Sequence, residues 1–129
     1  ECIDLHDNGH YLSKYDIKFY KKNFFSIKKK FSLITLNFLI EHLTDPNTFI
    51  KKSSNLLLKK GILYIEVPSD KAFNNQDKNH DVFNSTHNFI FSKSSIEYML
   101  NKHSFKIIKF DEGLNKRNYY FLGIYAEKN

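Results

Sequence analysis

The segment Phe31–Pro68 constrains the fold of this chain more than any other part of the sequence. Its two ends, Ser32–Leu36 and Ile62–Val67, are short apolar runs of the kind found in strands covered on both faces. Between them, the Asp-Pro pair at 45–46 favours a helix start, and Gly61 is expected to end that helix after a basic last turn. The sequence therefore predicts a β-α-β unit with parallel strands and a right-handed crossover.

Patterns elsewhere extend this α/β reading over the whole chain. Strands are predicted at Cys2–His6, Ile17–Tyr20 and Tyr119–Ala126, and Ser95–His103 has the apolar spacing of a helix. The stretch Ser69–Asn88 shows no periodicity and follows the carboxyl end of a predicted strand. Ligands bind at that end of open α/β sheets, and long irregular segments are often functional. We therefore interpret residues 69–92 as a substrate-side loop.

Length and composition exclude several classes of protein. The chain has 129 residues and a single cysteine, Cys2, so it can form one domain and no internal disulfide. No apolar run approaches the ~20 residues that span a bilayer, and no secretory pattern begins the chain. A soluble protein of the reducing cytoplasm, without membrane contact, is the simplest expectation.

The formal net charge of +6 raises the question of a nucleic-acid partner. The lysines are scattered, with one tight run at Lys28–Lys30, and Arg117 is the sole arginine. Planar guanidinium groups are the usual means of base and phosphate recognition. The charge pattern is therefore typical of solvated surfaces and does not favour a nucleic-acid function.

Several short motifs follow one another in a characteristic order. Glu41-His42-Leu43 precedes the Asp-Pro pair, Gly61 follows the predicted helix, and Glu66-Val67-Pro68 ends the next strand. A later His87-x-x-x-Phe91-Ser92 element precedes the Ser95–His103 helix. In this order the chain resembles class I S-adenosylmethionine-dependent methyltransferases, in particular their small-molecule group. The resemblance implies a Rossmann-like, mostly parallel sheet with flanking helices.

One part of the family pattern is missing from this chain. Gly9, Gly61, Gly113 and Gly123 are its only glycines, and none forms the Gly-rich turn that lets the family's cofactor approach the backbone. Glu1–Leu5 matches the family's second strand. We therefore expect residues 1–129 to be an N-terminally incomplete methyltransferase-like domain, without the first strand, Gly-rich loop and first helix. A different α/β fold that begins with the strand at Ile3 is the alternative.

The resemblance also implies which residues contact the ribose of S-adenosylmethionine. Asp4, with Leu5 beside it, occupies the family's acidic position, where a carboxylate accepts hydrogen bonds from both ribose hydroxyls. Charge-assisted hydrogen bonds of this kind are strong and directional. Asp7 is the nearby competitor for this role, and an ordinary exposed acid at a strand end is the structural alternative.

Two further positions are implied for the rest of the cofactor. Asn23 stands where the family has an acceptor for the adenine amino group, and Phe24 or Phe25 could pack on the adenine face or in the core. Asn37 and Phe38 follow the strand whose turn, in the family, wraps the methionine end. Phe38 replaces a histidine that many members carry.

Candidate catalytic residues lie on the substrate side. Glu66 ends a strand and His87 ends the irregular segment, so either could remove a proton from a methyl acceptor. His42 is a third candidate, with packing as its alternative role, and Glu41 is expected to cap or anchor its turn. His80 and His87 with Asp77 and Asp81 fit no standard zinc spacing, so no metal is expected.

These observations predict S-adenosylmethionine-dependent methyl transfer to a small molecule such as a sugar, a quinone or another metabolite, by a longer domain of which this chain is a part. The fragment alone is expected to be inactive. The missing Gly-rich turn leaves a non-catalytic remnant or interaction module as an alternative. The positive charge leaves an RNA methyltransferase as another.

Overall fold

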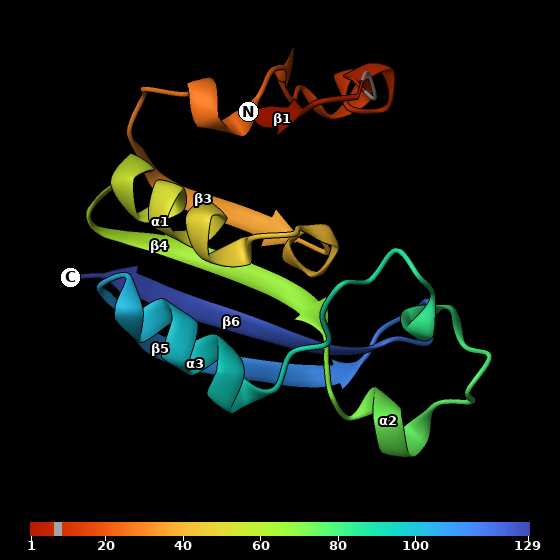
Figure 1. Ribbon diagram of the computed structural model, residues 1–129. Coiled ribbons are helices and arrows are strands. Elements are labelled where there is room, and N and C mark those ends of the chain that lie inside the picture. Colours follow the sequence, from red (N-terminus) through yellow and green to blue (C-terminus); the bar gives the residue numbers. More distant parts are fainter. Residues whose placement is uncertain (7–8) are drawn as a thin grey trace.

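The computed structural model describes residues 1–6 and 9–129, and the alternative ribose ligand Asp7 lies outside them. Two sheets form (Figure 1). A small parallel sheet pairs β1 with β2, and a larger sheet has the order β3-β4-β6-β5. β3 and β4 are parallel, whereas β6 is antiparallel to both of its neighbours, so β5 runs in the same direction as β4. The strands are β1 (Cys2–Asp4), β2 (Phe19–Lys21), β3 (Phe31–Asn37), β4 (Leu57–Pro68), β5 (Phe105–Leu114) and β6 (Tyr120–Lys128). The predicted α/β architecture is confirmed.

Two helices, α1 (Pro46–Leu56) and α3 (Lys93–Lys102), cover one face of the larger sheet (Figure 1). Side-chain caps define where both begin: the Asp45 carboxylate accepts a hydrogen bond from the Thr48 N–H, and Ser92 forms a capping box with Ser95. The core lies between these helices and the sheet. The remaining helices are α2 (Ala72–Asn75) and five short 3₁₀ turns, η1 (Gly9–Tyr11), η2 (Ser13–Tyr15), η3 (Phe24–Ser26), η4 (Ile40–His42) and η5 (Asp81–Phe83).

The predicted end of the first long helix is wrong. α1 ends at Leu56 and Leu57 already begins β4, so Gly61 lies inside a strand of 12 residues. Leu56 and Leu57 are both buried, although one closes a helix and the other opens a strand. An apolar run of this length fits either periodicity, and tertiary packing decides. Gly61 is instead a point of close approach, since an added Cβ would lie 2.9 Å from the Leu58 carbonyl oxygen.

β4 fixes which side chains point toward the core. Leu63, Ile65 and Val67 are fully buried beneath the helices, whereas Tyr64 and Glu66 alternate with them and point to the other face. None of the helices in the described residues covers that other face (Figure 1). Among all helices in the described part of the chain, none is long and apolar enough to cross a membrane.

The two sheets do not pair with each other. Among the described strands, β1 pairs only with β2 and β3 only with β4, so both carry an unpaired edge. Leu33 on β3 is 54% exposed. Side-chain contacts instead join the N-terminal layer, which contains β1, β2 and η3, to α1 on the larger sheet. Phe24 stacks on Phe49 with ring centroids 4.2 Å apart, and Lys52 Nζ donates to the Ile27 carbonyl oxygen at 2.7 Å.

The turn after α3 offers a stability test. Ser104 has φ 63°, a left-handed conformation that favours glycine. A Ser104→Gly variant is therefore expected to raise the free energy of unfolding by about 1 kcal/mol. Ser54→Gly, inside α1, is the matched control and should lower it by about 0.5–1 kcal/mol. Urea denaturation of both variants checks the prediction. A change in unfolding free energy of the same sign in both variants would contradict it.

Candidate functional site

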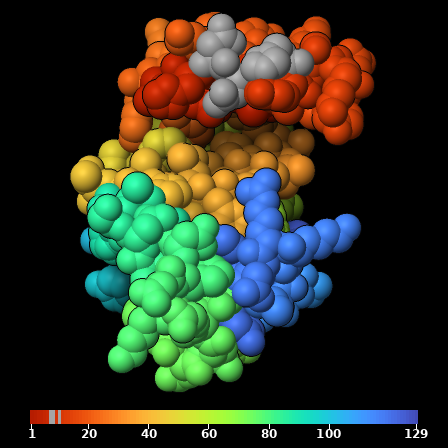
Figure 2. All heavy atoms as spheres, turned by 90° about the vertical axis from the view of Figure 1, so that its right-hand side faces the viewer, coloured from red at the N-terminus to blue at the C-terminus, as the bar shows by residue number. Residues whose placement is uncertain are grey.

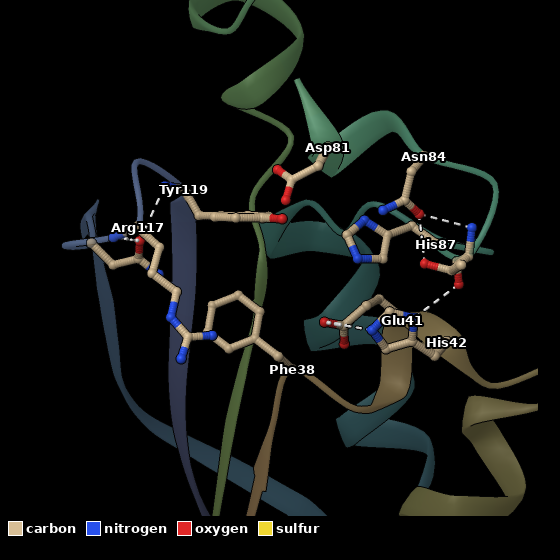
Figure 3. Close-up of a pocket in the computed structure, with 10 residues that line it drawn as sticks. Phe38, Glu41, His42, Asp81, Asn84, His87, Arg117 and Tyr119 are labelled. Carbon is tan, nitrogen blue, oxygen red and sulfur yellow. Dashed lines mark hydrogen bonds and ion pairs between the residues drawn. The ribbon is translucent and has the colours of Figure 1, made fainter. Parts of the chain in front are cut away.

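A cavity of about 410 Å³ lies where β3 and β4 end at their carboxyl ends (Figure 3). Figure 2 views this side of the molecule, with the green atoms of the 69–92 segment beside the blue atoms of the β5–β6 connection. The volume suits a small molecule. The cavity is lined by Phe38, Glu41, His42, Asp81, Asn84, Thr86, His87, Asn115, Arg117 and Tyr119.

Glu41 is the most unusual residue of the cavity. It lies in the 3₁₀ turn η4 and is fully buried, and neither carboxylate oxygen has a hydrogen-bond partner among the described residues. Buried polar groups are almost always paired, and an unpaired carboxylate is costly to keep charged. Burial accordingly raises the pKa of Glu41 to about 7.

His42 and His87 lie beside this carboxylate, with their ring centroids 4.7 Å apart. The Nδ1 of His42 lies 2.8 Å from the Thr86 carbonyl oxygen, and the Nδ1 of His87 lies 2.7 Å from that of Val82. A carbonyl oxygen only accepts, so each Nδ1 must carry the hydrogen. In the neutral rings both Nε2 atoms therefore keep their lone pairs. The Nε2 atom of His42 lies 3.8 Å from Glu41 Oε1.

Backbone hydrogen bonds join the two segments that supply these groups. The amides of Asn88 and Phe89 both donate to the Glu41 carbonyl oxygen, at 2.8 and 3.2 Å. The Asn88 side chain donates to the His42 carbonyl oxygen at 2.9 Å. The positions of Glu41, His42 and His87 relative to one another are therefore fixed by main-chain contacts as well as by packing.

The opposite wall of the cavity comes from the β5–β6 connection and from the end of β3. Tyr119 points toward Asp81, and its ring lies 6.1 Å from that of Phe38 (Figure 3). Burial, together with the nearby Asp81 carboxylate, raises the pKa of Tyr119 to about 12. Tyr119 is therefore a hydrogen-bond donor at neutral pH, while Arg117 supplies the positive charge of this wall.

Of the predicted catalytic residues, His42 and His87 meet in the cavity and Glu66 lies apart. Glu66 is on the helix-free face of β4, where its Oε2 accepts a hydrogen bond from the Tyr64 hydroxyl at 2.6 Å. It pairs in register with Asn37, so the two side chains share that face. The Glu66 carbonyl also accepts from the Phe38 N–H at 2.8 Å.

The residues predicted to contact the cofactor follow the ends of β1, β2 and β3. Asp4 is the last residue of β1, and its Oδ1 accepts from the His6 N–H at 3.0 Å, with Leu5 exposed beside it. Asn23 caps η3 by accepting from the Phe25 N–H, and Phe24 is stacked on Phe49. Asn37 ends β3, and Phe38 follows it with φ 46°.

Sequence reasoning did not assign Glu41, Arg117 or Tyr119 to the site. Glu41 was expected only to anchor its turn, since its burial cannot be seen in the sequence. Tyr119 was placed in the closing strand. β6 is antiparallel to β4, so its first residues return to the edge where β4 ends. An antiparallel last strand would have predicted that the residues just before β6, Arg117 and Tyr119 among them, lie at the cavity.

The match to a known family agrees with this architecture. Residues 3–109 match the family model described as a methyltransferase domain, and the chain belongs to this family. No curated protein sequence matches it.

Solved structures share the fold at low sequence identity. One is 1,6-didemethyltoxoflavin-N1-methyltransferase from Burkholderia thailandensis, crystallised with S-adenosylhomocysteine (TM-score 0.74, 15% identity, 98% of this chain and 60% of that one). An S-adenosylmethionine-dependent methyltransferase from Clostridium acetobutylicum gives a TM-score of 0.72 at 12% identity, over 98% of this chain and 74% of that one.

Magnesium protoporphyrin IX methyltransferase from Synechocystis, with bound S-adenosylmethionine, matches 86% of this chain with a TM-score of 0.63 and 13% identity. This chain spans about half of that structure, 45% of its length. The Rossmann-like methyltransferase fold predicted from the sequence is thereby confirmed.

Proposed function

We propose that this chain is the later part of a domain that transfers a methyl group from S-adenosylmethionine to a small-molecule acceptor. The observation that carries the proposal is the cavity beside Glu41, His42 and His87, in a chain of the methyltransferase family. Its volume lies within the range of small-ligand pockets, and it is lined by a few convergent polar groups. S-adenosylmethionine, when bound, supplies an electrophilic methyl group on a sulfonium.

The residues at the strand ends fit such a cofactor. Asp4 offers a carboxylate at the end of β1, and Asn37 offers an exposed amide at the end of β3. Phe38 both follows Asn37 and lines the cavity, so it marks the boundary between the cofactor side and the acceptor side. The unpaired edges of β1 and β3 support the proposal that a further strand, with its Gly-rich turn, completes the domain between them.

On the acceptor side, this chain positions the molecule and handles its proton. Arg117 can donate hydrogen bonds to an acceptor oxygen, and the Nε2 lone pair of His42 or His87 can accept a proton from its hydroxyl or amine. Much of the rate of an in-line displacement comes from this positioning. The 69–92 segment contributes four cavity residues, which supports its proposed role in substrate recognition: Asp81, Asn84, Thr86 and His87.

A cofactor-binding experiment tests the proposal. The proposal requires a longer protein that contains the additional strand and Gly-rich turn. In that protein Asp4→Ala is expected to weaken S-adenosylmethionine binding by roughly ten- to a hundredfold, because a charge-assisted hydrogen bond is worth about 1.5–3 kcal/mol. Isothermal titration calorimetry measures the change. Asp16→Asn, which removes an exposed carboxylate from the same N-terminal layer, should leave the affinity unchanged.

The 129-residue chain by itself should bind the cofactor poorly in the same titration. Failure of the longer protein to bind S-adenosylmethionine would contradict methyl transfer and favour the interaction module instead. Micromolar binding by the 129-residue chain would show that the proposed additional strand and turn are not needed.

A further inference from the structure

We propose that Glu41, His42 and His87 form a binding site for a divalent transition-metal cation, with zinc as the fitting metal. These three residues form the metal-ligand cluster found in the part of the chain that the structure describes. The sequence pattern did not predict this cluster: the set considered there was His80 and His87 with Asp77 and Asp81, and of these only His87 belongs to it. The ligands come instead from two separate turns that backbone hydrogen bonds hold together.

The histidine rings are already held as metal-binding rings are. Metal-ligating histidines typically donate one ring N–H to a carbonyl or carboxylate and coordinate through the other nitrogen. His42 and His87 both donate from Nδ1 to main-chain carbonyl oxygens, those of Thr86 and Val82. The tautomer and the ring orientation are therefore set before a cation arrives, with the two Nε2 lone pairs remaining as ligands.

Glu41 supplies the negative charge that such a site needs. Its carboxylate is fully buried and has no hydrogen-bond partner among residues 1–6 and 9–129. In Figure 3 it lies beside the His42 ring, on the same side of the cavity as His87. A cation coordinated by one of its oxygens would offset the cost of burying this charge, to which no protein group in the described residues donates a hydrogen bond.

The distances require only a small closure of the site. One ligand atom from each residue lies within 4.8 Å of the others, and His42 Nε2 is already 3.8 Å from Glu41 Oε1. With bonds of about 2.0–2.2 Å, a tetrahedral zinc ion places its ligands roughly 3.4 Å apart. The largest separation must therefore shrink by about 1.4 Å, which side-chain torsions can supply.

Two histidines and one glutamate leave a fourth zinc position open, as in catalytic rather than structural sites. The cavity adjoins the three ligands, so an oxygen or nitrogen of a bound molecule can take that position. A zinc ion lowers the pKa of a hydroxyl bound to it, so that it loses its proton to solvent near neutral pH. This loss of a proton rests on the proposed function, and solvent would then replace His42 or His87 as the proton acceptor. Cation binding itself does not rest on the proposed function.

The test uses zinc and cobalt ions alone, with the 129-residue chain freed of metal by a chelator. We expect calorimetry to show one zinc ion per chain, bound at micromolar concentration or tighter. Cobalt should give the intense visible bands of a four-coordinate site. Glu41→Gln and His87→Gln should each weaken zinc binding by at least about a hundredfold. His103→Gln changes a half-buried histidine outside the cavity, whose ring bonds to Asn47, and should leave the affinity unchanged.

Circular dichroism checks that each variant folds, and His42→Gln stands in for any variant that does not. Zinc affinity that is the same in the wild type and in the folded variants would overturn the proposal, as would the lack of zinc binding by the wild type. Because neither S-adenosylmethionine nor an acceptor is present, these results are independent of whether the protein transfers methyl groups.

Discussion

As the pH rises from 4.5 to about 7, the metal-free chain should lose roughly 3 kcal/mol of unfolding free energy through Glu41 alone. The ordinary pKa of this carboxyl is 4.5, and burial in the folded protein raises it to about 7. Between these values the unfolded chain is ionised at this position while the folded protein keeps the proton. Unfolding then releases a proton, so a higher pH favours the unfolded state.

Glu41→Gln should remove this slope, because an amide does not titrate. Chemical denaturation at several pH values between 4.5 and 8, in the presence of a chelator, measures the difference between the variant and the wild type. Asp45 and Glu112 have lowered pKa values, owing first to Thr48 and to Lys93 respectively, and both are common to the two proteins. Their contributions are lost as the pH falls, and they cancel in the comparison.

Glu97→Gln is the matched control, since it removes one glutamate from the exposed surface of α3. It should leave the pH dependence of the wild type in place. Parallel curves for the wild type and Glu41→Gln would contradict the prediction. Zinc should flatten the wild-type curve, because a bound cation holds the carboxylate in its ionised form at lower pH.

A second large effect is expected in the longer protein: His87→Ala should lower methyl-transfer turnover by about a hundredfold or more. The reason holds whether His87 removes the proton itself or holds a cation, since both roles use its Nε2 lone pair. The measurement is the rate of S-adenosylhomocysteine release with an acceptor found by screening phenols, amines and sugars. The affinity for S-adenosylmethionine, measured separately, should change little.

Two comparisons make this result specific. His103→Ala removes a half-buried histidine outside the cavity and should retain full turnover. Asp4→Ala should show the reverse pattern of His87→Ala, with weakened cofactor binding. Loss of cofactor binding in His87→Ala with unchanged acceptor kinetics would show that the division of the site into two sides is wrong.

Local sequence signals predicted some elements well because the signals agreed with one another. Around α3, the preceding His87-x-x-x-Phe91-Ser92 element and the apolar spacing of Ile96, Met99 and Leu100 indicate the same helix, and all three of these apolar side chains are buried. At the end of α1 the signals conflict. The run Leu56–Leu58 suits a helix or a strand, and Gly61 suggested a later end than the packing allows.

The candidate site was only partly predictable, because its decisive property is burial. Glu41 and His42 are adjacent in the sequence, yet one is fully buried and the other exposed. His87 lies beside them because the neighbouring amides of Asn88 and Phe89 donate to the Glu41 carbonyl oxygen, and no side-chain pattern encodes such backbone contacts. The family resemblance could therefore nominate the histidines, but it could not show that a buried carboxylate without a hydrogen-bond partner lies beside them.

The 69–92 segment is fastened at both ends, and this bears on how such a protein can diversify. Near its ends the Asp70 amide donates to the Phe91 carbonyl oxygen, and Asn88 and Phe89 bind the Glu41 carbonyl oxygen. The part of this stretch that precedes Val82 can change in length or composition while the two histidines and the glutamate keep their places, because the Val82 and Thr86 carbonyl oxygens that orient the histidines lie after it. New acceptor preferences can thus evolve, or be engineered by loop grafting, without rebuilding the reactive end of the cavity.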